Sequence, residues 1–133
     1  MIKMSLCNSI KRLGLPLVIT SQSPFLCFLI DTGSTHNILF SFVLEALKDR
    51  FEPISSTIEL SGIEGTNMTS KQVKGKIEFE GIESEVRFVV LAENKSISKI
   101  QNETGVQVHG ILGINFLLQN KWILDFKNLT INT

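Results

Sequence analysis

The chain has 133 residues, of which 43% are hydrophobic and 20% are charged, a composition typical of a globular domain with a substantial core. Its 13 basic side chains equal its 13 acidic ones, so no net field attracts nucleic acid, and we expect no nucleic-acid partner. No apolar run approaches the roughly 18 residues of a membrane span, so we expect no membrane association.

The start of the chain and its cysteines suggest a compartment. The first ten residues contain Lys3 but no long apolar segment, so they do not resemble a signal peptide. Two cysteines, Cys7 and Cys27, do not make a disulfide framework, and Cys27 lies in an apolar run as a small buried hydrophobe would. We therefore expect a single domain over residues 1–133, in the cytoplasm, with reduced thiols.

Apolar runs bounded by turn residues predict three strands and one helix before residue 50. The run at 25–30 contains no polar residue, so we expect it to be buried on both faces. Ser41 can cap the following helix, whose apolar positions share one face. The expected elements are strands at 15–20, 25–30 and 37–40 and a helix at 42–48.

The middle of the chain alternates polar and apolar residues, which predicts a long hairpin. Residues 57–61 lead into a glycine-flanked tip at 62–66, and residues 69–81 return as the second strand. The remaining expected elements are a strand at 85–91, an irregular surface loop at 92–109, a helix at 114–119 and strands at 122–126 and 129–133. Together these elements predict a mostly-β domain with two short helices.

Asp31 directly follows the apolar strand at 25–30, at the edge of the expected core, where few aspartates are found without a reason. Gly33 lets the backbone turn at once through angles that other residues avoid. Thr32 and Ser34 place hydroxyl groups beside the carboxylate. These are the parts of a catalytic aspartate loop, although catalysis by aspartic acids uses two carboxylates and the chain has one such loop.

Three features follow one another along the chain in an order that points to a known family. They are the apolar strand ending in Asp31-Thr32-Gly33-Ser34, the hairpin with its tip at 62–66, and Ile111-Leu112-Gly113 ahead of a short helix. In this order they resemble the retropepsin-like aspartic proteases, which include retroviral and retrotransposon proteases, DNA-damage-inducible eukaryotic proteases and stand-alone bacterial aspartyl protease domains. The resemblance covers about residues 15–131, and the hairpin at 122–128 looks most like the bacterial members. It implies a closed or partly open β-barrel with a flap hairpin.

The resemblance also implies a role for each residue of the aspartate loop. Asp31 would be the catalytic aspartate, and Thr32 would hydrogen-bond across a subunit interface to its symmetry mate. Gly33 would supply the turn and a backbone N–H to the carboxylate, and Ser34 would donate to the outer carboxylate oxygen.

Two further segments would contact the substrate if the resemblance holds. The hairpin tip would cover the substrate as a flap, and the aliphatic-glycine motif would pack behind the aspartate loop and line the cleft. The residues implied are Gly62, Ile63, Glu64 and Gly65 in the flap, and Ile111, Leu112 and Gly113 in the cleft wall.

The other two aspartates do not provide a second catalytic carboxylate. Asp49 lies between two basic residues and reads as a solvated surface charge, and Asp125 lies near a hairpin turn, where aspartate commonly has a structural role. Neither is followed by Thr-Gly. The second carboxylate must then be Asp31 of another copy, so we expect a homodimer with the site on its twofold axis.

Histidines suggest no metal site. His36 and His109 are the chain's two histidines, and no cysteine pair at ligand spacing accompanies them, so we expect neither a metal nor another cofactor. We expect His109 to be a loop residue near the wall of the active site.

These observations favour one function and leave others open. The first is an aspartic endopeptidase that hydrolyses peptide or protein substrates through a water activated by two Asp31 carboxyls. The alternative is a catalytically inactive, dimeric peptide-binding module on the same fold, and a plain dimerisation domain would bind no peptide. Replacing Asp31 with asparagine separates the first two, because cleavage should vanish while peptide binding survives.

Overall fold

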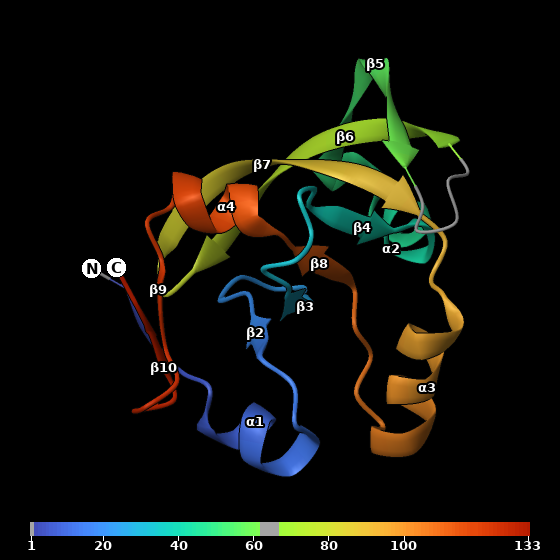
Figure 1. Cartoon of the computed structure of the whole chain (residues 1–133). Helices are drawn as coiled ribbons and strands as arrows, with labels where there is room; N and C mark the ends of the chain where they lie inside the picture. Colours follow the sequence, from blue (N-terminus) through green and yellow to red (C-terminus); the bar gives the residue numbers. More distant parts are fainter. Residues whose placement is uncertain (1, 62–66) are drawn as a thin grey trace.

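Within residues 2–61 and 67–133, which the computed structural model describes, the chain forms two β-sheets and four α-helices (Figure 1). The strands are β1 Lys3–Ser5, β2 Leu17–Ile19, β3 Cys27–Ile30, β4 Ile38–Phe40, β5 Phe51–Ser61, β6 Asn67–Phe79, β7 Ile82–Leu91, β8 Gly110–Leu112, β9 Ile123–Asp125 and β10 Thr130–Asn132. The helices are α1 Cys7–Leu13, α2 Ser41–Ala46, α3 Lys95–Thr104 and α4 Ile114–Gln119, with a 3-10 turn at Lys48–Arg50.

The smaller sheet joins the two ends of the chain. Its strand order is β1-β10-β9, and both pairings are antiparallel. Met4 lies opposite Ile131, and both side chains are buried in the main core cluster, so this sheet is attached to the rest of the molecule by its apolar face. The two termini therefore lie side by side (Figure 1).

The larger sheet has seven strands in the order β2-β3-β8-β4-β7-β6-β5. Strand β8 runs parallel to β3, with Leu112 opposite Ile30, and antiparallel to β4, with Ile111 opposite Ile38. Because β3 and β8 are parallel, their carboxyl ends meet at one edge of the sheet. The loop that begins at Asp31 and the turn that begins at Gly113 are thereby brought together.

Aromatic side chains fill the core beneath this edge. Phe28 of β3 is fully buried, stacks on Phe88 at 5.8 Å between ring centroids and meets Phe79 edge-on at 6.4 Å. Phe79 in turn contacts Trp122 at 5.2 Å. Burying one such side chain stabilises the fold by about 1.5–3 kcal/mol, so β3 is firmly anchored and the residue after it has a defined position.

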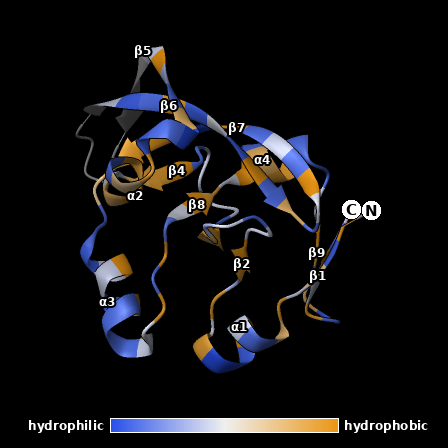
Figure 2. Ribbon diagram, turned by 180° about the vertical axis from the view of Figure 1, so that it is seen from behind, coloured by the Kyte–Doolittle hydropathy of each residue, from blue (hydrophilic) through white to orange (hydrophobic). Residues whose placement is uncertain are grey.

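The long strands β6 and β7 have one buried and one exposed face. Val73, Ile77 and Phe79 are buried in the core, while Lys76 between them is exposed, as period-two alternation requires. In Figure 2 the residues of β6 are mostly hydrophilic, while those of β2 and β8 are hydrophobic. The polar face of β6 and β7 is therefore available for contacts outside the core.

The expected mostly-β architecture is confirmed, but the sheets do not close into a barrel. β2 and β5 stand at the two ends of the seven-stranded order and do not pair with each other in the described part of the chain. The small sheet is a separate layer. Of the closed or partly open barrel that was expected, the closed form is therefore the part not found, because strand order depends on long-range pairing that alternation within one strand does not reveal.

The helices are more numerous than expected. Helix α1 was not predicted, and α3 occupies the segment expected to be an irregular loop at 92–109. The Asn94 side chain caps α3 by accepting from the Ile97 N–H at 2.9 Å, and Gly105 ends it with φ at 75°. Of its residues, Ile97 alone is fully buried, so its apolar pattern is faint.

Helix α2 lies close to the expected position, with a different first residue. Ser41, predicted as the cap, is the first helical residue, and Phe40 precedes it without a side-chain capping bond. The expected helix at 114–119 coincides with α4. Across the two described segments, no helix is long and apolar enough to cross a membrane.

Candidate active site

Asp31 stands where β3 ends, and its backbone is held by the neighbouring strands. Its N–H donates to the Leu112 carbonyl at 3.0 Å, and the N–H of Ile30 donates to the Pro16 carbonyl at 2.9 Å. Asp31 is half-buried, whereas Thr32 and Gly33 are exposed. The carboxylate thus projects from a rigid sheet edge beside an open loop.

The loop itself orients the carboxylate. The Gly33 N–H donates to Asp31 Oδ1 at 2.9 Å, and the Ser34 N–H donates to the Asp31 carbonyl at 3.1 Å. A Cβ at position 33 would lie 3.3 Å from the same Oδ1, so glycine leaves the carboxylate room at this close approach. The backbone contact implied for Gly33 is present.

Ser34 makes a different contact from the one expected. Its hydroxyl donates to the His36 carbonyl at 2.7 Å, and a hydroxyl has one proton to give. The expected donation from Ser34 to Asp31 is therefore absent in this arrangement. Ser34 instead closes the loop onto itself, which supports Asp31 indirectly.

The turn between β8 and α4 pins the aspartate loop from behind. Gly113 N–H donates to Asn37 Oδ1 at 2.9 Å, Ile114 N–H donates to the Ser34 carbonyl at 2.7 Å, and Asn115 Nδ2 donates to the Thr35 carbonyl at 2.8 Å. Three consecutive residues thus hold three residues of the loop. Sequence reasoning did not identify the contributions of Asn37 and Asn115, because the contacts join segments about 80 positions apart.

Residues of the aliphatic-glycine motif take different places behind the loop. Leu112 is fully buried in the main core cluster, while Ile111 is half-buried against the second cluster of apolar residues. A Cβ on Gly113 would come within 2.4 Å of the Ser34 carbonyl oxygen and 2.7 Å of the His36 carbonyl oxygen. Glycine is therefore required there by close approach.

The predicted flap residues lie outside the residues that the structure describes. Gly62, Ile63, Glu64 and Gly65 belong to the segment between β5 and β6, and their contact with substrate stays a prediction.

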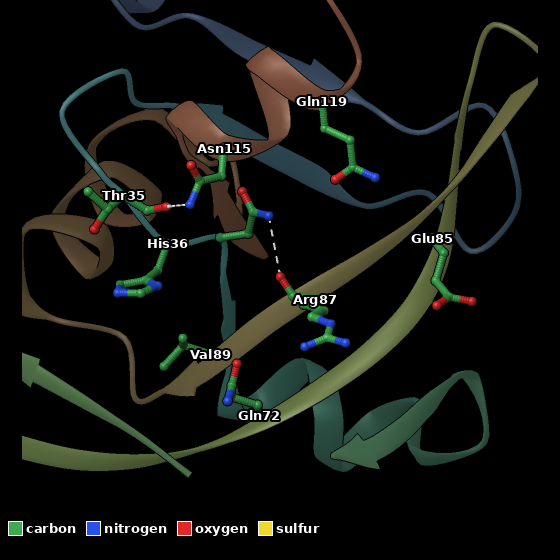
Figure 3. Close-up of a pocket in the computed structure, with 9 residues that line it drawn as sticks. Thr35, His36, Gln72, Glu85, Arg87, Val89, Asn115 and Gln119 are labelled. Carbon is green, nitrogen blue, oxygen red and sulfur yellow. Dashed lines mark hydrogen bonds between the residues drawn. The ribbon is translucent and has the colours of Figure 1, made fainter. Parts of the chain in front are cut away.

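A polar pocket of about 390 Å³ adjoins the aspartate loop (Figure 3). Three kinds of wall enclose it: the end of the loop, the polar face of β6 and β7, and one side of α4. The lining residues are Thr35, His36, Asn37, Gln72, Glu85, Arg87, Val89, Asn115 and Gln119. The alternation of charged residues along β7 was visible in the sequence, but the element that would face them was not.

His109 lies at the start of β8, at the opposite end of that strand from the turn behind Asp31. Its side-chain Nδ1 accepts from the Cys27 N–H at 2.9 Å. Its backbone N–H donates to the Cys27 carbonyl at 2.8 Å, and its backbone carbonyl accepts from the Phe40 N–H at 3.0 Å. It therefore joins β3 to β4 and does not form the expected wall of the active site. Burial lowers the pKa of His109 below its ordinary value.

Acid should destabilise the chain through His109. Because its pKa is lower in the folded than in the unfolded chain, the folded state resists protonation, and stability should fall as the pH drops below about 6.5. A proton on Nδ1 would also face the Cys27 N–H, donor against donor. His109→Asn keeps an acceptor near the same position without the titration, so its urea midpoint should lose less between about pH 7.5 and about pH 5.5 than that of the unmodified chain.

The other histidine provides the control for this measurement. His36→Asn should keep the pH dependence of the unmodified chain, because its side chain makes no contact of the His109 kind in the described structure. Equal pH dependence in His109→Asn and the unmodified chain would contradict the assignment.

Comparison with known proteins places this geometry in context. A model of the aspartyl protease family matches residues 15–116. The chain is similar in structure to EIAV protease complexed with the inhibitor HBY-793, with 20% sequence identity, a TM-score of 0.59 and coverage of 80% of this chain and 88% of that one.

It is also similar to the retroviral protease-like domain of Ddi1 from Leishmania major, with 13% identity, a TM-score of 0.54 and coverage of 88% of this chain and 89% of that one. No curated protein matches the sequence significantly. At these identities the structural likenesses concern the fold alone, and they confirm the retropepsin-like fold expected from the sequence.

Proposed function

Because this chain belongs to the aspartyl protease family, we propose that it is an aspartic endopeptidase whose catalytic unit is a homodimer with one Asp31 from each subunit. The observation that carries the proposal is Asp31 itself. It ends a buried strand, its carboxylate accepts from the Gly33 N–H at 2.9 Å, and its loop is pinned by the turn at Gly113. The carboxylate is thus preorganised in the way that acid–base catalysis on a bound substrate requires.

Peptide hydrolysis would proceed on a water held between the two Asp31 carboxyls. The ionised carboxylate takes a proton from the water as the water oxygen attacks the peptide carbonyl, while the protonated carboxyl donates to the carbonyl oxygen and stabilises the tetrahedral intermediate. Collapse of the intermediate breaks the C–N bond, and the amine leaves with a proton returned by the pair.

The structure of the chain supports the need for a second copy. Asp125 is engaged in its own turn, where it accepts from the Asn128 N–H at 3.0 Å and from Asn128 Nδ2 at 2.7 Å. These bonds from Asn128 lower its pKa, and the turn role expected from the sequence is confirmed. Asp49 is exposed in the 3-10 turn after α2. Neither carboxylate accompanies Asp31, so the second one comes from Asp31 of another chain.

Exposed apolar side chains also favour a homodimer. Leu118 on α4 is 68% exposed, Ile123 on β9 is 59% exposed and Phe126 after β9 is 58% exposed. They follow closely after the turn that pins the aspartate loop, and β9 is an edge strand of its sheet. Edge strands with apolar side chains pair readily with another chain.

The substrate we propose is an extended peptide that lies across the two Asp31 loops and adds its backbone to neighbouring strands. The segment containing Gly62, Ile63, Glu64 and Gly65 would cover it from each subunit. Ile111 and Gly113 would form part of the wall behind the loops. No cofactor takes part in this chemistry.

A peptide-library cleavage assay tests the proposal. We expect cleavage whose specific activity rises with chain concentration until the dimer is complete, and we expect a statine-type transition-state analogue to inhibit it. Sedimentation at the same concentrations should show the dimer. Robust cleavage by a chain that sediments only as a monomer would contradict the shared site, and binding of peptides without cleavage would support the inactive module.

A further inference from the structure

The polar pocket beside the aspartate loop contains one positively charged side chain, that of Arg87, in a position to bind a ligand. Arg87 projects from the polar face of β7, and Figure 3 shows its guanidinium between Glu85 and Gln72. Its backbone carbonyl accepts from Asn37 Nδ2 at 3.3 Å, so the strand is tied to the loop that begins at Asp31. The side chain is exposed and faces a space of about 390 Å³.

The ion pairs that the structure describes on the polar face of β6 and β7 do not include Arg87. Lys74 pairs with Glu52 at 3.7 Å and Lys76 pairs with Glu83 at 3.7 Å, but Arg87 forms no ion pair with any residue whose side chain the structure describes. Glu85 lines the same pocket and lies opposite Lys76 on β6. Among the described residues, Arg87 therefore lies in a polar enclosure without a carboxylate at ion-pairing distance.

The strand register places a second cation beside Arg87. Lys74 of β6 lies directly opposite Arg87 of β7 in the antiparallel ladder. Lys74 lines a neighbouring pocket and pairs with Glu52 at 3.7 Å, so its charge is compensated within the chain. Arg87 is therefore the cation of this pair that is left for an anionic ligand.

The chemistry of the Arg87 side chain selects the ligand. A guanidinium presents a planar fork of N–H groups that matches a carboxylate. The other walls include Glu85, His36 and neutral hydrogen-bonding groups such as Thr35, Asn115 and Gln119. This combination suits a carboxylate on a short polar side chain.

The place of the pocket relative to Asp31 indicates where such a carboxylate would come from. Asp31 and Thr35 are four residues apart, so their Cα atoms are separated by at most about 14 Å. An extended peptide advances about 3.4 Å per residue, so a residue within about four or five positions of the scissile bond reaches the pocket. The proposed substrate therefore passes within reach of Arg87.

We propose that Arg87 binds an acidic side chain of the peptide substrate outside the residues that flank the scissile bond. The proposal rests on the proposed protease function and adds a preference to it. Glu85 limits the preference to one carboxylate, because a second acidic group would meet its charge.

Paired peptides that differ only in Glu against Gln at each position test the proposal. The unmodified chain should cleave the Glu member with a higher kcat/KM at one or two positions, by roughly five-fold, as expected of an exposed ion pair. Arg87→Gln should bring this Glu-to-Gln ratio close to one, and Arg87→Glu should bring it below one. Arg12→Gln, the same substitution on α1, should keep the ratio of the unmodified chain.

A binding measurement separates failure of this proposal from failure of the proposed function. Fluorescent versions of the same peptide pairs are titrated into the Asp31→Asn chain, which should bind without cleaving. A preference for Glu that Arg87→Gln removes supports the pocket even if the unmodified chain cleaves no peptide. A Glu-to-Gln ratio near one in the unmodified chain, or an equal ratio in Arg87→Gln, overturns the proposal.

Discussion

Replacing Asp31 with asparagine is expected to abolish peptide cleavage while the fold and peptide binding remain. Asparagine has nearly the shape of aspartate, and its amide oxygen can still accept the Gly33 N–H that now bonds Oδ1 at 2.9 Å. It cannot take a proton from water, so the loss should be at least the roughly 10²–10⁴-fold that a general base contributes. The measurement is kcat/KM on a cleaved library peptide, together with the urea midpoint of each chain.

Mixing experiments sharpen this prediction into a test of the shared site. If equal amounts of unmodified and Asp31→Asn chains exchange freely, about one quarter of the dimers contain two aspartates. Activity per total chain should then fall to about one quarter, whereas a site complete within one chain would leave about one half. Asp49→Asn, which alters an exposed carboxylate in the 3-10 turn after α2, is the matched control, and mixing it with the unmodified chain should leave the activity per total chain unchanged.

Local signals in the sequence were sufficient for the parts of the fold nearest the site. The apolar run before Asp31 became β3, in which Cys27, Phe28 and Ile30 are buried, although Phe25 at the start of the run lies outside the strand and is 62% exposed. The short helix after Gly113 is α4, whose buried residues Phe116 and Leu117 follow the glycine closely. The single aspartate motif led to the homodimer as a proposal, since no local pattern offered another carboxylate.

Contacts between distant segments account for what the sequence did not reveal. Cys27 and His109 are joined by two hydrogen bonds across more than 80 positions, and the identity of neither residue predicts its partner. Ser34 gives its proton to His36, although its place in the motif suggested Asp31. Helix α3 was missed because it is held by one cap and one buried isoleucine. In each case the deciding term is a tertiary or capping contact that periodicity does not encode.

Adding a single methyl group at Gly113 is expected to damage both stability and activity. Its φ is −92°, which any residue can adopt, so the requirement for glycine comes only from space. A Cβ would lie 2.4 Å from the Ser34 carbonyl oxygen and 2.7 Å from the His36 carbonyl oxygen, and both are backbone atoms that cannot turn aside. Gly113→Ala should therefore cost about 3 kcal/mol of unfolding free energy, the upper part of the usual range for overpacking.

Displacement of the Ser34 and His36 carbonyls should also lower the catalytic rate, because these atoms belong to the loop that carries Asp31. A misplacement of about 1 Å in a catalytic group can cost about 100-fold in rate, so kcat/KM should fall well beyond the loss of folded chain. Gly105→Ala is the matched control: its φ is 75° with nothing within 4 Å of a Cβ, so it should cost about 1 kcal/mol and leave kcat/KM intact. If Gly113→Ala proves as stable and as active as Gly105→Ala, then the β8–α4 turn does not position Asp31, and the loop must be held by the partner subunit instead.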